Sequence, residues 1–159
     1  MGEVMGAFVE AVGLTVRESA GTESGLRELT EQELPETGEG LSAALEIRSA
    51  RVDQLVLCLP EQTAQALAER VLAGAAPEGV DESMVLDCAG ELVNVTAGQA
   101  KALLSGTPDR LSFSTPTVHA GPGLPLRQGR SASCRVASFD SEVGELSLRV
   151  YVKGPQAGA

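Results

Sequence analysis

Polar or small residues recur at steps of three and four along positions 87–105, which is the spacing of one helix face. Among them Glu91 and Asn94 place a carboxylate and an amide one turn apart. An amide can orient a water molecule because it carries a donor and an acceptor and does not titrate. The neighbouring positions are mostly apolar, so we predict a narrow polar ribbon on an otherwise buried helix. We define this polar ribbon as Asp87, Glu91, Asn94, Gly98, Lys101 and Ser105.

A solvated helix face is the ordinary explanation of such a ribbon, and spacing alone favours it. Two glycines, Gly90 and Gly98, argue for more, because each costs roughly 1 kcal/mol relative to alanine inside a helix. Glycines at such positions often let another backbone come close. They therefore indicate a place of close approach beside Glu91 and Asn94.

The chain is long enough for one domain with a real core and too short for two ordinary ones, with 159 residues. Its hydrophobic fraction is 43%, yet aromatic residues make up only 3%, so Leu, Val and Ala must build the core. We predict a single domain over residues 1–154 and a C-terminal tail over 155–159.

The charge and the cysteines limit the possible partners and compartments. A formal net charge of −10 repels a phosphate backbone, which argues against nucleic acid and favours a protein surface that carries Lys or Arg. No apolar run approaches the ~20 residues of a membrane span. Cys58, Cys88 and Cys134 are widely spaced within apolar segments, so we expect reduced core residues and a cytoplasmic protein.

Apolar periodicity predicts three helices and five strands. The helices are expected over residues 3–18, 61–72 and 81–105, and Asp81 or Ser83 can cap the last one. The strands are expected over 41–49 and 52–59, paired as a hairpin, and over 110–115, 131–139 and 145–153. The stretch 19–40 is predicted to be either a mobile acidic connection or a poorly paired edge strand.

His119 is the only histidine, and no second histidine or acidic motif accompanies it. We expect it in a loop or at a strand end, with no metal or catalytic role. The glycine-rich stretch 121–129 lacks the Lys-Ser/Thr of a phosphate-binding loop, so we predict a flexible connection there.

Asp87, Glu91 and Asn94 form the string Asp-x3-Glu-x2-Asn, and Pro116 follows after 21 residues within STPTVHAG. This pattern resembles the signature of the CheC/CheX/FliY chemotaxis phosphatases. The resemblance covers most of the chain, including the first helix, the early hairpin and the final hairpin. A single copy of the motif is present, which resembles CheX, with one site per subunit, more than CheC, with two.

The resemblance implies an α/β fold of the CheC-like kind, a mainly antiparallel sheet with the long helices packed on one face. It also implies a homodimer joined at sheet edges, for which an unpaired hairpin strand at 145–153 would supply a physical reason. The implied activity is hydrolysis of the aspartyl-phosphate of a CheY-like receiver domain. The receiver carries its own Mg²⁺, so this chain needs no metal or other cofactor of its own.

In this interpretation Glu91 and Asn94 are the catalytic residues. Asn94 orients the attacking water, and Glu91 pairs with the cation that lines the receiver's phosphate site. Asp87, Gly90 and Gly98 are expected to contact the partner, although Asp87 could equally serve only to keep the ribbon solvated. The alternative is a non-catalytic adaptor of the same fold that binds a receiver or a flagellar switch component, and retention of Glu91 and Asn94 favours the enzyme.

Overall fold

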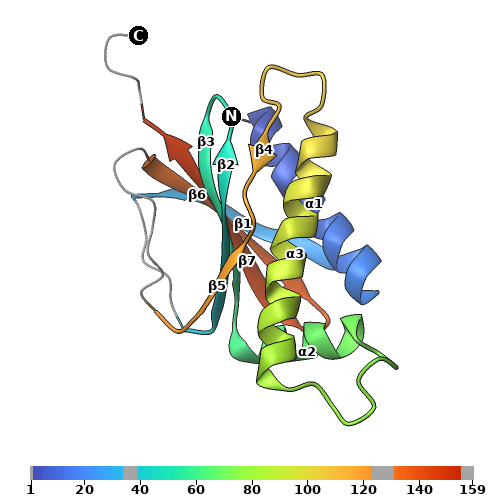
Figure 1. The fold of residues 1–159 in the computed structure, drawn as a ribbon. Coiled ribbons are helices and arrows are strands. Elements are labelled where there is room, and N and C mark those ends of the chain that lie inside the picture. Colours follow the sequence, from blue (N-terminus) through green and yellow to red (C-terminus); the bar gives the residue numbers. More distant parts are fainter. Residues whose placement is uncertain (1, 34–38, 123–130, 155–159) are drawn as a thin grey trace.

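The computed structural model describes residues 2–33, 39–122 and 131–154. The predicted tail at 155–159 and most of the predicted connection at 121–129 lie outside these residues. The described part is an α/β fold in which three helices lie on one side of a seven-stranded sheet (Figure 1). All the strand pairings are antiparallel.

The three helices follow the predicted ones closely. They are α1 (Gly2–Ala20), α2 (Glu61–Val71) and α3 (Glu82–Leu103). Asp81 is the N-cap of α3, and its side chain accepts a hydrogen bond of 2.9 Å from the backbone N–H of Met84. No helix among the described residues combines the length and apolar character that crossing a bilayer requires.

The sheet has the strand order β1-β6-β7-β3-β2-β4, and β5 also pairs with β2. The strands are β1 (Ser24–Gln32), β2 (Leu41–Arg48), β3 (Val52–Leu59), β4 (Ser112–Phe113), β5 (Thr117–Ala120), β6 (Ser131–Ser141) and β7 (Gly144–Lys153). The predicted hairpin is present, with β2 paired to β3 from Leu41↔Leu59 to Glu46↔Gln54.

The main core lies between the sheet and the helices. Phe8 of α1, Leu67 of α2 and Val93 of α3 are fully buried there against Leu55 and Leu148 of the sheet. A smaller apolar cluster covers part of the opposite face of the sheet and includes Ala44, Val56, Cys134, Val136 and Tyr151. The helices thus cover one face, as the resemblance implied.

Three expectations about the strands were wrong. Residues 24–32 form β1, which is an edge strand as one of the two alternatives predicted, but the expected poor pairing is wrong because β1 has eight register partners on β6. Strand β7 is not an unpaired edge, because it lies between β3 and β6. The predicted strand at 110–115 shrinks to the two residues of β4, and β5 follows it as a separate strand.

Candidate functional site

The polar ribbon of α3 faces solvent. Asp87, Glu91 and Lys101 are exposed, and Asn94 and Gly98 are partly exposed. The opposite side of the helix, at positions such as Ala97, is fully buried. Among the described residues, no side chain forms a hydrogen bond or an ion pair with Asp87, Glu91 or Asn94. The structure therefore brings the predicted catalytic pair together on one surface, with both side chains available.

Contacts with α1 hold α3 in place on the side away from the ribbon. Small residues such as Ala11 and Ala100, both with no exposed surface, let the two helices approach closely. At the edge of this contact the Gln99 amide donates a hydrogen bond of 3.1 Å to the carboxylate of Glu18. The rotation of α3 about its axis is thereby fixed, and so is the direction in which Asn94 points.

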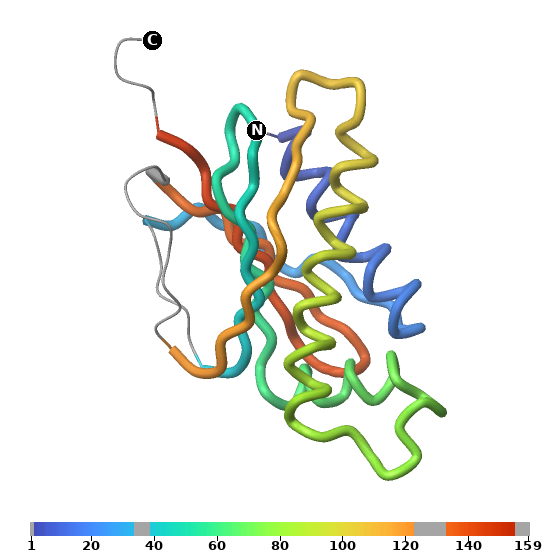
Figure 2. Tube along the Cα trace, viewed as in Figure 1, coloured from blue at the N-terminus to red at the C-terminus, as the bar shows by residue number. Residues whose placement is uncertain are grey.

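Gly90 is a point of close approach, as predicted, but it is buried, and its neighbours are side chains of this chain rather than another backbone or a partner. A Cβ atom at this position would lie 3.2 Å from Cγ2 of Val118 and 3.7 Å from Cγ of Pro116. The segment from β4 to β5 runs back along α3 at this level (Figure 2). Pro116, which the motif singled out, thus lies beside Gly90, the residue that precedes Glu91 in the chain.

Gly98 differs from Gly90. Nothing among the described residues lies within 4 Å of a Cβ built at Gly98, so no segment of this chain explains the glycine. The prediction that another segment of the chain approaches Gly98 closely is therefore wrong for the described residues. Contact of Gly98 with a partner stays a prediction.

His119 lies in β5, opposite Ser42 of β2, and its Nε2 atom is 3.1 Å from the carbonyl oxygen of Pro122. Across the described ranges, no group of three or more His, Cys, Asp or Glu side chains is arranged to hold a metal ion. The role of His119, and metal binding in general, stay at the level of prediction.

The cysteines pack in apolar surroundings, as predicted. Cys88 and Cys134 are buried, Cys58 is partly buried, and all three are free thiols. Burial raises the pKa of Cys88, and the nearby carboxylate of Glu91 raises this pKa further. These thiols therefore stay protonated and unreactive near neutral pH.

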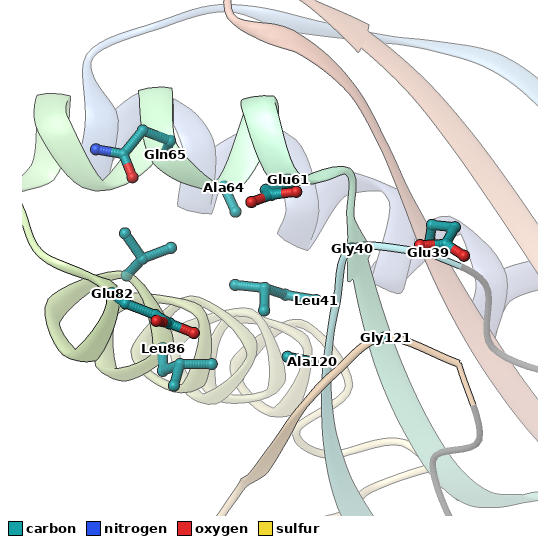
Figure 3. A pocket seen from close by; sticks show the side chains of 11 residues that line it. Glu39, Gly40, Leu41, Glu61, Ala64, Gln65, Glu82, Leu86, Ala120 and Gly121 are labelled. Atoms are coloured by element: carbon teal, nitrogen blue, oxygen red, sulfur yellow. The ribbon is translucent and has the colours of Figure 1, made fainter.

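A hollow of about 360 Å³ lies where the N-terminal ends of α2 and α3 meet the ends of β2 and β5. Figure 3 shows Glu61 and Gln65 of α2 facing Glu82 and Leu86 of α3 across it. Glu61 and Glu82 lie in the first turns of their helices, where negative charge stabilises the helix dipole. This stabilisation accounts for the two carboxylates without a catalytic role.

A second hollow, of about 420 Å³, lies at the other end of α3. It is lined by Lys101 of α3, Arg48 of β2 and Arg110 of the segment that follows α3. Sequence reasoning placed Lys101 on the ribbon and missed the other two residues. No local signal reveals them, because they come from elements far apart in the chain.

The family profile described as chemotaxis phosphatase CheX matches residues 41–140, which include the polar ribbon and Pro116. None of the curated proteins matches the chain. Similar folds occur in solved structures of the chemotaxis protein CheX. For the protein from Desulfovibrio desulfuricans the TM-score is 0.82 at 21% identity, over 95% of this chain and 99% of that chain.

For the protein from Vibrio vulnificus the TM-score is 0.78 at 20% identity, over 95% of this chain and 99% of that chain. The third structure is a complex of CheX with CheY, BeF₃ and Mg²⁺ from Borrelia burgdorferi. It has a TM-score of 0.70 at 14% identity, over 94% of this chain and 97% of the compared chain. These likenesses establish the fold.

Proposed function

Since this chain belongs to the chemotaxis phosphatase family CheX, we propose that it hydrolyses the aspartyl-phosphate of a CheY-like receiver domain. The observation that carries the proposal is the placement of Glu91 and Asn94. They lie one turn apart on the exposed ribbon of a helix whose opposite side is buried, and no described residue forms a hydrogen bond or ion pair with them.

The reaction is the attack of a water oxygen on phosphorus, with cleavage of the bond between phosphorus and the aspartate oxygen. The products are inorganic phosphate and a free aspartate carboxylate, and a proton of the water goes to the phosphate. Asn94 accepts a hydrogen bond from the water and donates one to the phosphoryl group, which holds the water in line with the bond that breaks. The receiver domain supplies the Mg²⁺ that neutralises the phosphoryl oxygens.

Glu91 secures the register of Asn94. Its carboxylate pairs with the cationic side chain beside the receiver's phosphate, and a charge-assisted contact of this kind is strong where water is excluded. Asp87 lies one turn earlier on the same ribbon and adds negative potential toward a basic surface. The Borrelia burgdorferi complex of CheX with CheY supports the choice of partner.

The test measures phosphate release from a phosphorylated receiver of the same organism. With Asn94→Ala the rate should fall close to the receiver's own rate, while the melting temperature stays unchanged because the side chain is partly exposed. Gln62→Ala is the matched control, since it removes an exposed amide of α2 that lies outside the polar ribbon. Full activity of a folded Asn94→Ala protein would show that the proposed chemistry is wrong.

The same assay separates the enzyme from an adaptor. An adaptor of this fold would bind the receiver without shortening the lifetime of its phosphoryl group.

The proposal also includes a cytoplasmic homodimer joined at sheet edges. Because β7 is internal, the described edges available for such a joint are β1 on one side and β4 with β5 on the other.

A further inference from the structure

Three cationic side chains converge at the C-terminal end of α3. Lys101, Arg48 and Arg110 line the hollow of about 420 Å³, and all three are exposed. We call this hollow the basic pocket; its lining is completed by Ser105, Gly106, Leu111 and Ser112. The C-terminal end of α3 and β4 lie together at the top of Figure 1.

No ion pair within the described chain involves Lys101, Arg48 or Arg110. Asp109, which precedes Arg110 in the chain, is buried and already pairs with Arg51 at 3.0 Å. Lys101 in the last turn of α3 stabilises the helix dipole, but this effect explains neither Arg48 nor Arg110. The chain has 22 acidic and 12 basic residues, so three cations in one hollow, with no ion pair to the described chain, form a site that an anionic partner surface would fit.

Charge is separated along α3. The N-terminal half carries Glu82, Asp87 and Glu91, and no Lys or Arg occurs between Arg70 and Lys101. The cations gather only at the far end of the helix. A partner lying along α3 therefore meets negative potential over one half and positive potential over the other.

The basic pocket is close enough to Asn94 to be covered by the same partner. Lys101 follows Asn94 by two turns, so it lies on the same face about 10 Å further along the axis. A standard protein interface buries about 800 Å² on each partner, a patch about 30 Å across. Covering unpaired cations without supplying carboxylates would be costly.

We propose that the basic pocket receives an acidic surface of the receiver whose phosphoryl group reaches Glu91 and Asn94. The inference rests on the proposed function and adds the direction in which the receiver lies. Its basic surface lies over the acidic half of α3, and its carboxylates lie over Lys101, Arg48 and Arg110. The pocket contributes to recognition of the receiver and takes no part in the chemical step.

The experiment reverses two charges of the pocket with Lys101→Glu and Arg110→Glu in one protein. The control is a double variant, Arg17→Glu and Arg70→Glu, at exposed positions near the ends of α1 and α2. Each double variant makes the net charge of −10 more negative by four units, so the two proteins have the same total charge. KM and kcat are measured with the phosphorylated receiver, and thermal melting checks the fold. For the pocket variant we expect KM to rise about tenfold or more and kcat to stay within about twofold. The control should change KM by less than about threefold.

The outcomes separate this inference from the proposed function. Equal KM values for pocket variant and control, with Asn94→Ala inactive, would overturn the inference and leave the phosphatase intact. If the wild-type protein releases no phosphate, the two charge variants are compared in binding to a receiver carrying a stable phosphate mimic. Weaker binding of the pocket variant then supports the inference for an adaptor, and equal binding overturns it. Binding of inorganic phosphate at Lys101 and Arg110 with unchanged receiver affinity would show a small-anion site and would also overturn it.

Discussion

The hydroxyl oxygens of Thr15 and Thr96 lie 3.1 Å apart in the buried contact between α1 and α3. Thr15 also donates to the carbonyl of Ala11, and Thr96 has the carbonyl of Leu92 within reach, each at 2.8 Å. Thr96 follows Asn94 by two positions on the same helix. The threonine contact therefore helps to set the rotation that keeps the Asn94 amide outward.

Thr15→Val and Thr96→Val should each lower the free energy of unfolding by about 1 kcal/mol, because each removes a buried hydrogen bond while the partner hydroxyl retains a carbonyl. The double variant should lose less than the sum, since both single changes remove the same contact. Urea unfolding of the four proteins measures this coupling. Strict additivity would mean that the hydroxyls do not interact.

Glu91→Lys should weaken binding to the receiver by at least about 100-fold, because it places two like charges together at a contact without water. The measurement is the affinity for a receiver that carries a stable phosphate mimic. Glu10→Lys makes the same charge change at an exposed position of α1 and should leave the affinity nearly unchanged. Unchanged affinity of a folded Glu91→Lys protein would favour an adaptor that docks through another surface.

Gly90 and Gly98, the two glycines of α3, should respond differently to alanine. Gly98→Ala should raise the free energy of unfolding by up to about 1 kcal/mol, because the new methyl group meets open space and helix propensity improves. At Gly90 the same gain is offset by contact with Val118, so Gly90→Ala should be close to neutral. Thermal melting and KM are measured for both variants. An unchanged KM for a stabilised Gly98→Ala protein would show that the receiver does not approach Gly98.

Stability should fall at alkaline pH. Burial raises the pKa of Cys134 from 9.0 to about 11 and that of Tyr151 from 10.0 to about 12, with Arg149 partly offsetting both shifts. From pH 9 upward the unfolded chain releases protons that the folded protein retains, so the free energy of unfolding declines as the pH rises. Cys134 contributes to this decline between pH 9 and about 11, and Tyr151 contributes between pH 10 and about 12. Urea unfolding between pH 7 and 10.5 measures the decline. Cys134→Ala should make it shallower, and parallel curves for the two proteins would contradict the assignment to this thiol.

Helices and the β2–β3 hairpin were predictable because their apolar periodicity is local. The polar ribbon was predictable for the same reason, since helical spacing alone places Glu91 beside Asn94. Strand β1 was misread because Leu26 and Leu29 are exposed and charged residues surround them. Backbone pairing with β6, more than a hundred residues away, holds this strand in place.

Features that depend on distant segments could not be predicted. The central place of β7 follows from its pairing with β3, which no local pattern reveals. The basic pocket joins Arg48, Lys101 and Arg110 from separate elements. At Gly90 the sequence indicated a close approach but could not name Val118 as the neighbour, because four residues are too few for β5 to show a clear periodicity.

The internal position of β7 determines when the domain can fold during its synthesis. β7 joins β3 to β6, so the sheet is split in two until Lys153 has emerged from the ribosome. Until then the β2–β3 hairpin, whose residues are mostly buried in the finished protein, displays apolar strands to other nascent chains. A stop codon at the start of β7 therefore removes the middle of the sheet, and we expect the truncated product to be a substrate for chaperones and proteases.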